Sequence, residues 1–427
     1  MTLDPVHRQH IAALAADLRP AADEDDHRAL AAEVWEEYLD PLYGEDGPVL
    51  EPLDDRARYT APITDLGVQE PAFETVHGLD SGTINPRTFR NGLVLDLAQA
   101  AMAADPSDLD LHRSRTIVKS VHSNDVRHDF DRDWEPFDEG YGRTRVVQVG
   151  DLARDQERVV HGLSLYLAES SHALRHADAV SACLLLDGPV YPKQLVTWAE
   201  QHAGLRDIVA DEPLVGEVVR NYTALVERFA ARSVPIVGVV KSGQSNALLR
   251  ALNAAGAPTP WASDRGFFTH VLEQRDDGER RTEALSWTSW FVSRLGADGT
   301  FASVGPTGDR AKTPPDVPGL STEEPGSGEL GPTAYEVTFF VVYDPRTDVA
   351  YRIELPRAFA ADERTRERVR RQVIRGIAAR SGPPEAVARA DSLARISRDE
   401  SEALVSAIEE AFDSDEETTY DDLRWDL

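Results

Sequence analysis

The chain has 427 residues and a formal net charge of -30, from 75 acidic and 45 basic residues. The length allows two or three average domains or one large one, and a hydrophobic content of 41% is enough for a substantial core. No apolar run approaches the roughly 18 residues of a membrane-spanning helix, and the single cysteine, Cys183, excludes an intramolecular disulfide. With no N-terminal signal pattern, these features predict a cytoplasmic protein without membrane contact.

Lysine is rare among the basic residues, which include only Lys119, Lys193, Lys241 and Lys312. Loss of lysine, retention of arginine and acidity spread along the chain are typical of adaptation to molar salt, where charges are screened within about 3 Å. Acidity would normally argue against a nucleic-acid partner, but counterion release is weak when the solution is already salty. The charge therefore neither supports nor excludes binding to DNA.

The apolar spacing along the chain predicts helices alternating with buried strands. An N-terminal helical pair is expected over 7–19 and 27–39, and a linker rich in Pro, Gly and Asp from 41 to about 71. The predicted strands are 73–80, 93–97, 116–121, 180–187, 235–241, 285–294, 334–343 and 348–355. The predicted later helices are 152–176, 214–232, 361–379, 384–396 and 399–412, with loops at 123–143 and about 305–332. Two-sided apolar strands alternating with helices indicate an α/β fold with both faces of the sheet covered.

This pattern predicts three parts. Residues 1–66 form the N-terminal helical segment and linker, residues 67–412 one large domain with a mobile loop at about 305–332, and residues 413–427 an acidic tail. The tail is expected to keep the protein in solution, with a docking peptide as the alternative.

Two aspartates each end a short apolar run and precede small residues that favour turns. Asp80 lies in His77–Thr83, where Gly82 is expected to permit a turn, and Asp187 lies in Leu184–Pro189. A buried strand can deliver a carboxylate to the edge of a sheet in this way, and Glu169, on the predicted helix between them, supplies a third oxygen donor. Hard oxygen ligands suit Mg²⁺ or Mn²⁺, the ions of phosphodiester hydrolysis, so the pattern predicts a metal-dependent nuclease. The alternatives are turn-capping or solvated aspartates and a solvated glutamate.

Two further residues are candidates for the same site. Lys241 ends an apolar strand and could orient a scissile phosphate or the attacking water, the alternative being a lysine that extends from the strand end to solvent. Asp391 shares a predicted helix face with apolar Val387 and Ala394, where a carboxylate is costly unless it is paired or bound to a metal. The alternative for Asp391 is an ordinary, partly exposed helix aspartate.

Four residues on late strands have structural and functional interpretations. Arg352 and Glu354 project to one face and are expected to pair structurally rather than contact phosphate. Trp287 and Trp290 are expected in the core rather than stacked on bases.

The order of these segments resembles the NurA family of archaeal DNA-repair nucleases over about 73–410. The matching segments are Gly78–Gly82, Glu169 some 18 residues before Asp187, Leu186–Pro189, Val237–Ser242, Ala262–Asp264, Tyr351–Pro356 and Pro384–Ala394. Acidity and lysine poverty make the chain look like a halophilic archaeal member.

The resemblance implies a fold and an activity. The fold would be ribonuclease H-like and related to PIWI domains, with a mixed sheet flanked by helices, an N-terminal helical segment and a homodimeric assembly. The activity would be that of a Mn²⁺- or Mg²⁺-dependent single-strand endonuclease and 5′-to-3′ exonuclease with two ions. It would work with a hexameric HerA-type ATPase in resecting DNA ends for double-strand-break repair by homologous recombination.

The resemblance also assigns roles to the candidate residues. Asp80, Glu169 and Asp187 would be metal ligands, and Lys241 would orient phosphate or water. The family usually carries Ala-His where this chain has Ala390-Asp391, so Asp391 is a candidate fourth ligand in place of the histidine.

Two other functions fit parts of the sequence. Asp80-Ser81-Gly82-Thr83 resembles the phosphate loop of ATP-binding proteins of the actin and sugar-kinase type, but such a phosphotransferase needs a second glycine-rich loop and an adenosine motif. A non-catalytic accessory subunit of a DNA translocase would keep partner binding after loss of the carboxylates.

Overall fold

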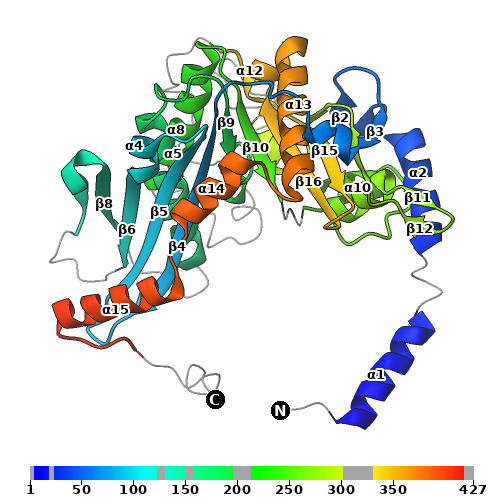
Figure 1. Cartoon of the computed structure of the whole chain (residues 1–427). Coiled ribbons are helices and arrows are strands. Elements are labelled where there is room, and N and C mark those ends of the chain that lie inside the picture. The colour runs from blue at the N-terminus through cyan, green and yellow to red at the C-terminus, as the bar shows by residue number, and fades with distance from the viewer. Residues whose placement is uncertain are drawn as a thin grey trace.

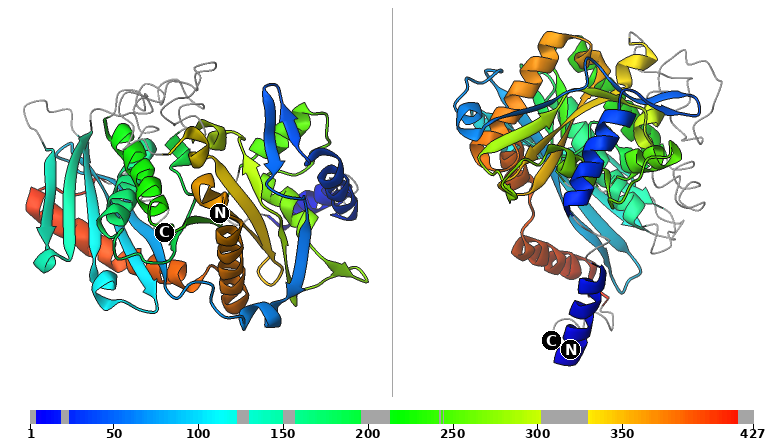
Figure 2. Two further views of the ribbon diagram at one scale, coloured as in Figure 1. Left: turned by 90° about the horizontal axis from the view of Figure 1, so that it is seen from above. Right: turned by 90° about the vertical axis from the view of Figure 1, so that its right-hand side faces the viewer.

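The computed structural model describes residues 4–18, 24–122, 130–149, 157–195, 213–241, 243, 245–301 and 330–417. Within these ranges, one mixed sheet of 14 strands runs through the molecule, and helices lie on both of its faces (Figures 1 and 2). The arrangement confirms the predicted class, an α/β fold with a mixed sheet flanked by helices and preceded by a helical segment. None of the helices in these ranges combines the length and apolarity that crossing a membrane requires.

The strands of the large sheet follow one another in space as β1-β2-β14-β15-β16-β10-β9-β4-β5-β6-β8-β7, and β13 pairs with β15 and β3. Their bounds are β1 Leu42–Gly44, β2 Gly47–Pro52, β3 Arg58–Pro62, β4 Val76–Thr88, β5 Val94–Asp105, β6 Arg115–His122, β7 Arg132–Phe137, β8 Gly142–Val149, β9 Leu184–Leu186, β10 Ile236–Val240, β13 Ala284–Thr288, β14 Phe291–Ser293, β15 Val337–Asp344 and β16 Val349–Pro356. Two short strands form a separate hairpin, β11 Arg275–Asp276 and β12 Glu279–Arg280.

All seven helices predicted from the sequence are present, as α1, α2, α5, α8, α13, α14 and α15. The bounds of the helices are α1 Pro5–Leu18, α2 Glu24–Tyr38, α3 Ile63–Gly67, α4 Leu109–Arg113, α5 Glu157–Arg175, α8 Pro213–Ala230, α9 Ala247–Ala254, α10 Asp264–Leu272, α11 Ala297–Phe301, α12 Arg357–Ala360, α13 Glu363–Arg380, α14 Glu385–Ala394 and α15 Arg398–Phe412. Single 3₁₀ turns lie at Asp138–Gly140 and Pro332–Tyr335.

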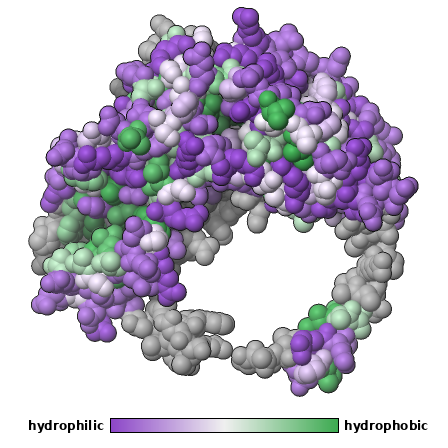
Figure 3. Space-filling view, viewed as in Figure 1, coloured by the Kyte–Doolittle hydropathy of each residue, from purple (hydrophilic) through white to green (hydrophobic). Residues whose placement is uncertain are grey.

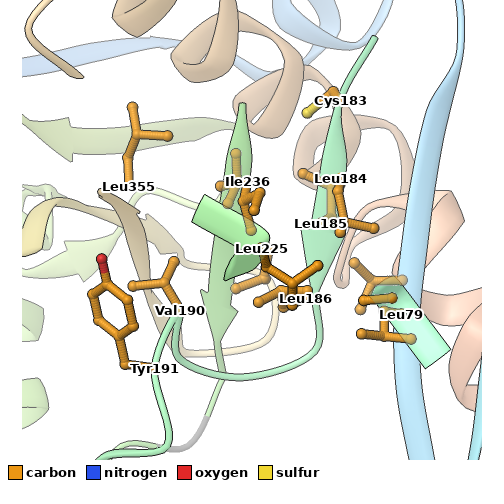
Figure 4. Packing of buried hydrophobic residues seen from close by; sticks show 14 of the residues in the cluster. Leu79, Cys183, Leu184, Leu185, Leu186, Val190, Tyr191, Leu225, Ile236 and Leu355 are labelled. Carbon is orange, nitrogen blue, oxygen red and sulfur yellow. The ribbon is translucent and has the colours of Figure 1, made fainter. Parts of the chain in front are cut away.

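The centre of the sheet is the short strand β9, which lies between β4 and β10 and is parallel to both. All three of its leucines are buried, and they pack with Leu79, Leu225 and Ile236 (Figure 4). Burial on both faces explains why this strand has an unbroken apolar run. Strand β9 therefore fixes the relative position of β4 and β10, which flank it.

The predicted linker at 41–71 is wrong, because this stretch contains β1, β2, β3 and α3. Strand β2 pairs with β14 and β3 pairs with β13, and these partners lie far downstream in the sequence. Pairing with a distant strand stabilises a segment whose own composition favours turns, so the local pattern is misleading. The division of the chain into domains at residue 66 stays a prediction.

The predicted loop at 123–143 is wrong for its second half, which contains β7 and the start of β8. Strand β8 is parallel to β6, and the guanidinium of Arg143 lies over the ring of Trp134 at 4.3 Å from its centroid. The predicted strand at 285–294 is divided into β13 and β14. Most of the predicted loop at 305–332 and most of the acidic tail lie outside the described residues.

Candidate metal centre

Three aspartates from distant parts of the chain converge at one place. One carboxylate oxygen from each of Asp80, Asp187 and Asp391 lies within 4.8 Å of the other two. Asp80 belongs to β4, Asp187 follows β9 directly, and Asp391 belongs to α14. The convergence requires a particular register between β4 and β9 and close packing of α14 on the sheet.

The register of β4 and β9 sets the first two aspartates side by side. Leu79 is paired with Leu186, and the N–H of Asp187 donates to the carbonyl of Leu79 at 2.9 Å. Asp80 and Asp187 are the next residues along the two parallel strands, so their side chains emerge next to each other on the same face. Gly188 then has a φ of +139°, a conformation that glycine adopts readily and that turns the chain away from the sheet.

Two glycines on the same face of β4 let α14 lie directly against the strand. A Cβ atom at Gly78 would lie 2.1 Å from the carbonyl oxygen of Ala386, and one at Gly82 would lie 2.1 Å from that of Ala394. Because residues 78, 80 and 82 face the same way in a strand, α14 covers Asp80 and brings Asp391 to it. The prediction that Gly82 permits a turn is wrong, since β4 continues to Thr88 and the glycine instead makes room for a helix.

The pKa values of Asp80 and Asp187 are both raised. Burial, with the charges of Asp187 and Glu169 nearby, raises the pKa of Asp80 well above its usual range. Burial also raises the pKa of Asp187, although its carboxylate accepts a hydrogen bond from the Lys241 ammonium at 2.5 Å. Lys241 pairs with Asp187, and the largely exposed Arg395 pairs with Asp391 at 3.0 Å. Neither cation contacts Asp80 or Glu169 in these pairs, so part of the negative charge remains unneutralised. Hard oxygen donors that are held together despite their mutual repulsion fit a divalent cation such as Mn²⁺ or Mg²⁺.

Glu169 lies beside this cluster without belonging to its three closest oxygens. Its carboxylate accepts hydrogen bonds from the hydroxyl of Ser81 at 2.6 Å and from that of Tyr222 at 3.3 Å. Burial raises the pKa of Glu169 to about 7. Ser81 points to the face of β4 opposite Asp80, because adjacent strand residues alternate. The role of Glu169 as a metal ligand therefore stays a prediction, and so do the roles of the other candidate residues.

Ser81 and Tyr222 are site residues that the sequence reasoning missed. Ser81 could have been found, since it alternates with Asp80 and therefore faces the helix that carries Glu169. Tyr222 is on α8, and its ring meets that of Tyr166 edge-on at 6.3 Å between centroids. No sequence signal connects α8 to the site, because the contact depends on helix packing.

A buried ionic cluster supports the loop that follows Asp187. Glu354 accepts a hydrogen bond from the N–H of Val190 at 3.2 Å and pairs with Lys193 at 2.5 Å. Arg352 pairs with Glu354 at 2.8 Å and with Asp298 at 2.6 Å. These contacts agree with the structural interpretation of Arg352 and Glu354.

The two tryptophans differ in their surroundings. Trp290 is 2% exposed and packs against Phe340, as expected for the core. Trp287 is partly buried and stacks on Tyr59 with 5.9 Å between the ring centroids. Neither observation supports base stacking.

A family model described as the NurA domain matches residues 74–396, which include all five candidate site residues. The chain belongs to the NurA family. No curated protein matches it in sequence.

Three solved structures are similar to the chain. The crystal structure of the NurA nuclease from Sulfolobus solfataricus is 11% identical, with a TM-score of 0.51, over 96% of this chain and 97% of that chain. A crystal structure of NurA with manganese is 10% identical, with a TM-score of 0.35, over 82% and 92%. A crystal structure of NurA bound to dAMP and manganese is 10% identical, with a TM-score of 0.42, over 96% and 98%. The first of these supports the family fold for this chain.

Proposed function

We propose that this NurA-family chain is a metal-dependent deoxyribonuclease that hydrolyses phosphodiester bonds. The supporting observation is the cluster of Asp80, Asp187 and Asp391, whose oxygens lie within 4.8 Å of one another. Mutual repulsion of closely spaced carboxylates is relieved by a bound cation, so the cluster is suited to hold one or two divalent ions.

The residues have distinct proposed roles. Asp80 and Asp187 hold the ions from neighbouring strands, and Asp391 takes the position where the family usually has histidine. Glu169, held by Ser81 and Tyr222, is close enough to raise the pKa of Asp80 and is a further candidate ligand. Lys241 fixes the orientation of Asp187 and presents an ammonium to an incoming phosphate. A pair of Mn²⁺ or Mg²⁺ ions, when bound, supplies an activated water and stabilises the charge on the leaving oxygen.

The finer functional assignments are also proposals, and family membership supports them. They are single-strand endonuclease and 5′-to-3′ exonuclease activity on DNA, cooperation with a hexameric HerA-type ATPase, and a homodimeric state. The corresponding process is DNA end resection for repair of double-strand breaks by homologous recombination in the cytoplasm of a halophilic archaeon.

The decisive experiment is digestion of labelled single-stranded DNA in high KCl with Mn²⁺, Mg²⁺ or EDTA. We expect cleavage with a divalent ion and none with EDTA. Because each aspartate contributes several kcal/mol to holding the ions, D80N and D187N are each expected to lose at least about 1,000-fold in rate. The matched control is D55N, the same chemical change at an exposed position, which should cleave normally.

Unchanged Mn²⁺-dependent cleavage by purified D80N or D187N would remove that residue from the site. The accessory-subunit alternative predicts no cleavage by the native chain and ATPase stimulation that survives loss of the carboxylates. The kinase-like alternative needs a phosphate loop at Asp80–Thr83, whereas these residues lie within β4.

A further inference from the structure

Asp96 of β5 is a buried carboxylate in an unusual environment. Its side chain is 0% exposed, and neither of its oxygens has a hydrogen-bond partner among the described residues. The other buried acids in the described ranges each pair with an arginine or a lysine or accept backbone N–H groups, and they are Asp264, Asp298, Glu336, Asp344 and Glu354. A buried carboxylate without such a partner is costly, so a ligand for Asp96 has to be sought.

Two histidines lie next to this carboxylate. The Nε2 of His122 lies 3.8 Å from the Oδ2 of Asp96, and the Nδ1 of His161 lies 3.7 Å from the same oxygen. Both nitrogens are buried and, within the part of the chain that the structure describes, have no hydrogen-bond partner, and the same holds for the Nδ1 of His122. Five buried polar atoms of three side chains are therefore unpaired at one place.

The fold brings these side chains together between the sheet and α5. Ser120 of β6 is the cross-strand partner of Asp96, and its hydroxyl is hydrogen-bonded to that of Ser164 on α5. Asp96 and Ser120 point the same way, because directly paired residues share a face. His122 is two residues beyond Ser120 on the same strand, and His161 is about one turn before Ser164 on the helix. Helix α5 packs on both strands (Figure 1), so the three side chains meet under its first turns.

Asp96 keeps its charge in this buried place. Burial alone would raise the pKa of Asp96, but the neighbouring His122 and His161 outweigh it, so the pKa is lowered. The cluster therefore combines an anionic oxygen with imidazole nitrogens. Zn²⁺ and similar transition ions bind such a mixed set, whereas Mg²⁺ and Mn²⁺ favour oxygen ligands.

The distances within the cluster favour a metal ion over two other ways of satisfying these atoms. A direct N–H···O hydrogen bond would need a separation of about 2.9 Å, and a bridging water would need about 4.5 Å. Two ligands of one tetrahedral ion, with bonds of about 2.0–2.1 Å, lie about 3.4 Å apart. The observed 3.7 Å and 3.8 Å are nearest to the separation for a shared ion.

Binding of an ion also requires one imidazole to turn. Among the described residues, only the three aspartates of the metal centre bring three ligand atoms within 4.8 Å of one another. The Nε2 of His122 and the Nδ1 of His161 are therefore farther apart than this. Because neither nitrogen of His122 is hydrogen-bonded to a described residue, its ring can rotate toward His161 without losing such a bond.

We propose that Asp96, His122 and His161 bind a transition-metal ion of the Zn²⁺ type, at a site separate from the centre of Asp80, Asp187 and Asp391. Three protein ligands leave the fourth tetrahedral position to water. The ion joins β5 and β6 to the first turns of α5, and so stabilises the folded chain. The proposal does not depend on nuclease activity, because none of its ligands belongs to the three-aspartate centre.

The test is a titration of the full chain with Co²⁺ in high KCl. Co²⁺ takes the place of Zn²⁺ and absorbs visible light strongly when it is four-coordinate, but weakly when it is six-coordinate with oxygen ligands alone. Excess Mg²⁺ competes for the oxygen-only centre and so keeps it out of the measurement. We expect one strongly absorbing Co²⁺ per chain.

Two ligand variants should lose this signal. Groups that only support a metal ligand already contribute about 10–100-fold to affinity, so D96N and H161A, which remove ligands, should each weaken Co²⁺ binding at least about 100-fold. The matched controls are D55N and H10A, the same changes at an exposed aspartate and an exposed histidine, and both should bind Co²⁺ as the native chain does.

Thermal unfolding with and without Zn²⁺ gives a second measurement. Zn²⁺ should raise the melting temperature of the native chain and of both controls, and leave those of D96N and H161A unchanged. H161A keeps the proposal testable if D96N fails to fold, because the side chain of His161 is 18% exposed.

Two results would overturn the proposal: only weak absorption by the native chain, or equal Co²⁺ affinity in H161A and the native chain. Either would leave a direct hydrogen bond between Asp96 and a histidine as the explanation of the cluster. The D80N variant separates this site from the proposed nuclease centre, because it should still bind Co²⁺ strongly while it loses cleavage.

Discussion

Glu169 is a buried acid that two hydroxyl groups hold beside the three aspartates. Hydrogen bonds from Ser81 and Tyr222 favour its charged form, yet burial outweighs them and raises its pKa to about 7. The folded state therefore binds a proton at Glu169 more tightly than the unfolded state does. The stability that this proton provides is complete below the unfolded pKa of about 4.5 and is lost as the pH rises through about 7.

The metal-free protein should consequently become less stable between pH 5 and pH 8. Glu169 contributes at most about 3 kcal/mol to this loss, and E169Q, which cannot ionise, should lack that contribution. Thermal unfolding in EDTA at several pH values measures the difference, with E70Q as the control at an exposed glutamate. An E169Q protein with the pH dependence of the native chain would show that Glu169 ionises normally.

The contact between β4 and α14 depends on two residues without side chains. At Gly82, a Cβ atom would lie 2.1 Å from the backbone oxygen of Ala394, so α14 would have to move away. We expect G82A to lose about 1–3 kcal/mol of stability, as for other overpacked contacts. Cleavage should fall with it, because the movement displaces Asp391 from Asp80. Denaturant unfolding and the DNA digestion measure the two effects.

Gly382, just before α14, provides the control for this variant. A Cβ atom there would meet no atom within 4 Å, so G382A should keep both stability and activity. If G82A kept the stability and activity that are expected of G382A, close packing of α14 on β4 would not be needed for the site.

The elements that could be predicted from sequence are those whose pattern is local. Strands β9 and β10 are short apolar runs and α5 has regular spacing, so each could be recognised without knowing its neighbours. Strand β3 could not, because it is stabilised by β13: Thr60 and Ser286, for example, are hydrogen-bonded at a separation of 226 residues. Asp187 was recognisable at the end of β9, and Asp80 by the apolar run before it, although β4 continues past Asp80 to Thr88. The place of Asp391, in contrast, depends on α14 packing against Gly78 and Gly82.

At the scale of the whole molecule, the charge of -30 sets how stability responds to salt. Figure 3 shows a mostly hydrophilic face, and like charges on such a surface repel until salt screens them, at about 10 Å in 0.1 M salt and about 3 Å in 1 M. We expect the melting temperature to rise by several degrees between these KCl concentrations. An uncharged osmolyte at matched osmolality should raise it less, and an equal rise would argue against screening as the cause.

The three aspartates occupy positions 80, 187 and 391 of a chain of 427 residues. During translation, Asp80 and Asp187 are made before the helix that bears Asp391. A polypeptide that ends before α14 would keep Asp80 and Asp187. It would lack the helix that packs on β4 and brings Asp391 next to them. The three-aspartate centre that we propose for cleavage can therefore assemble only after α14 has been made.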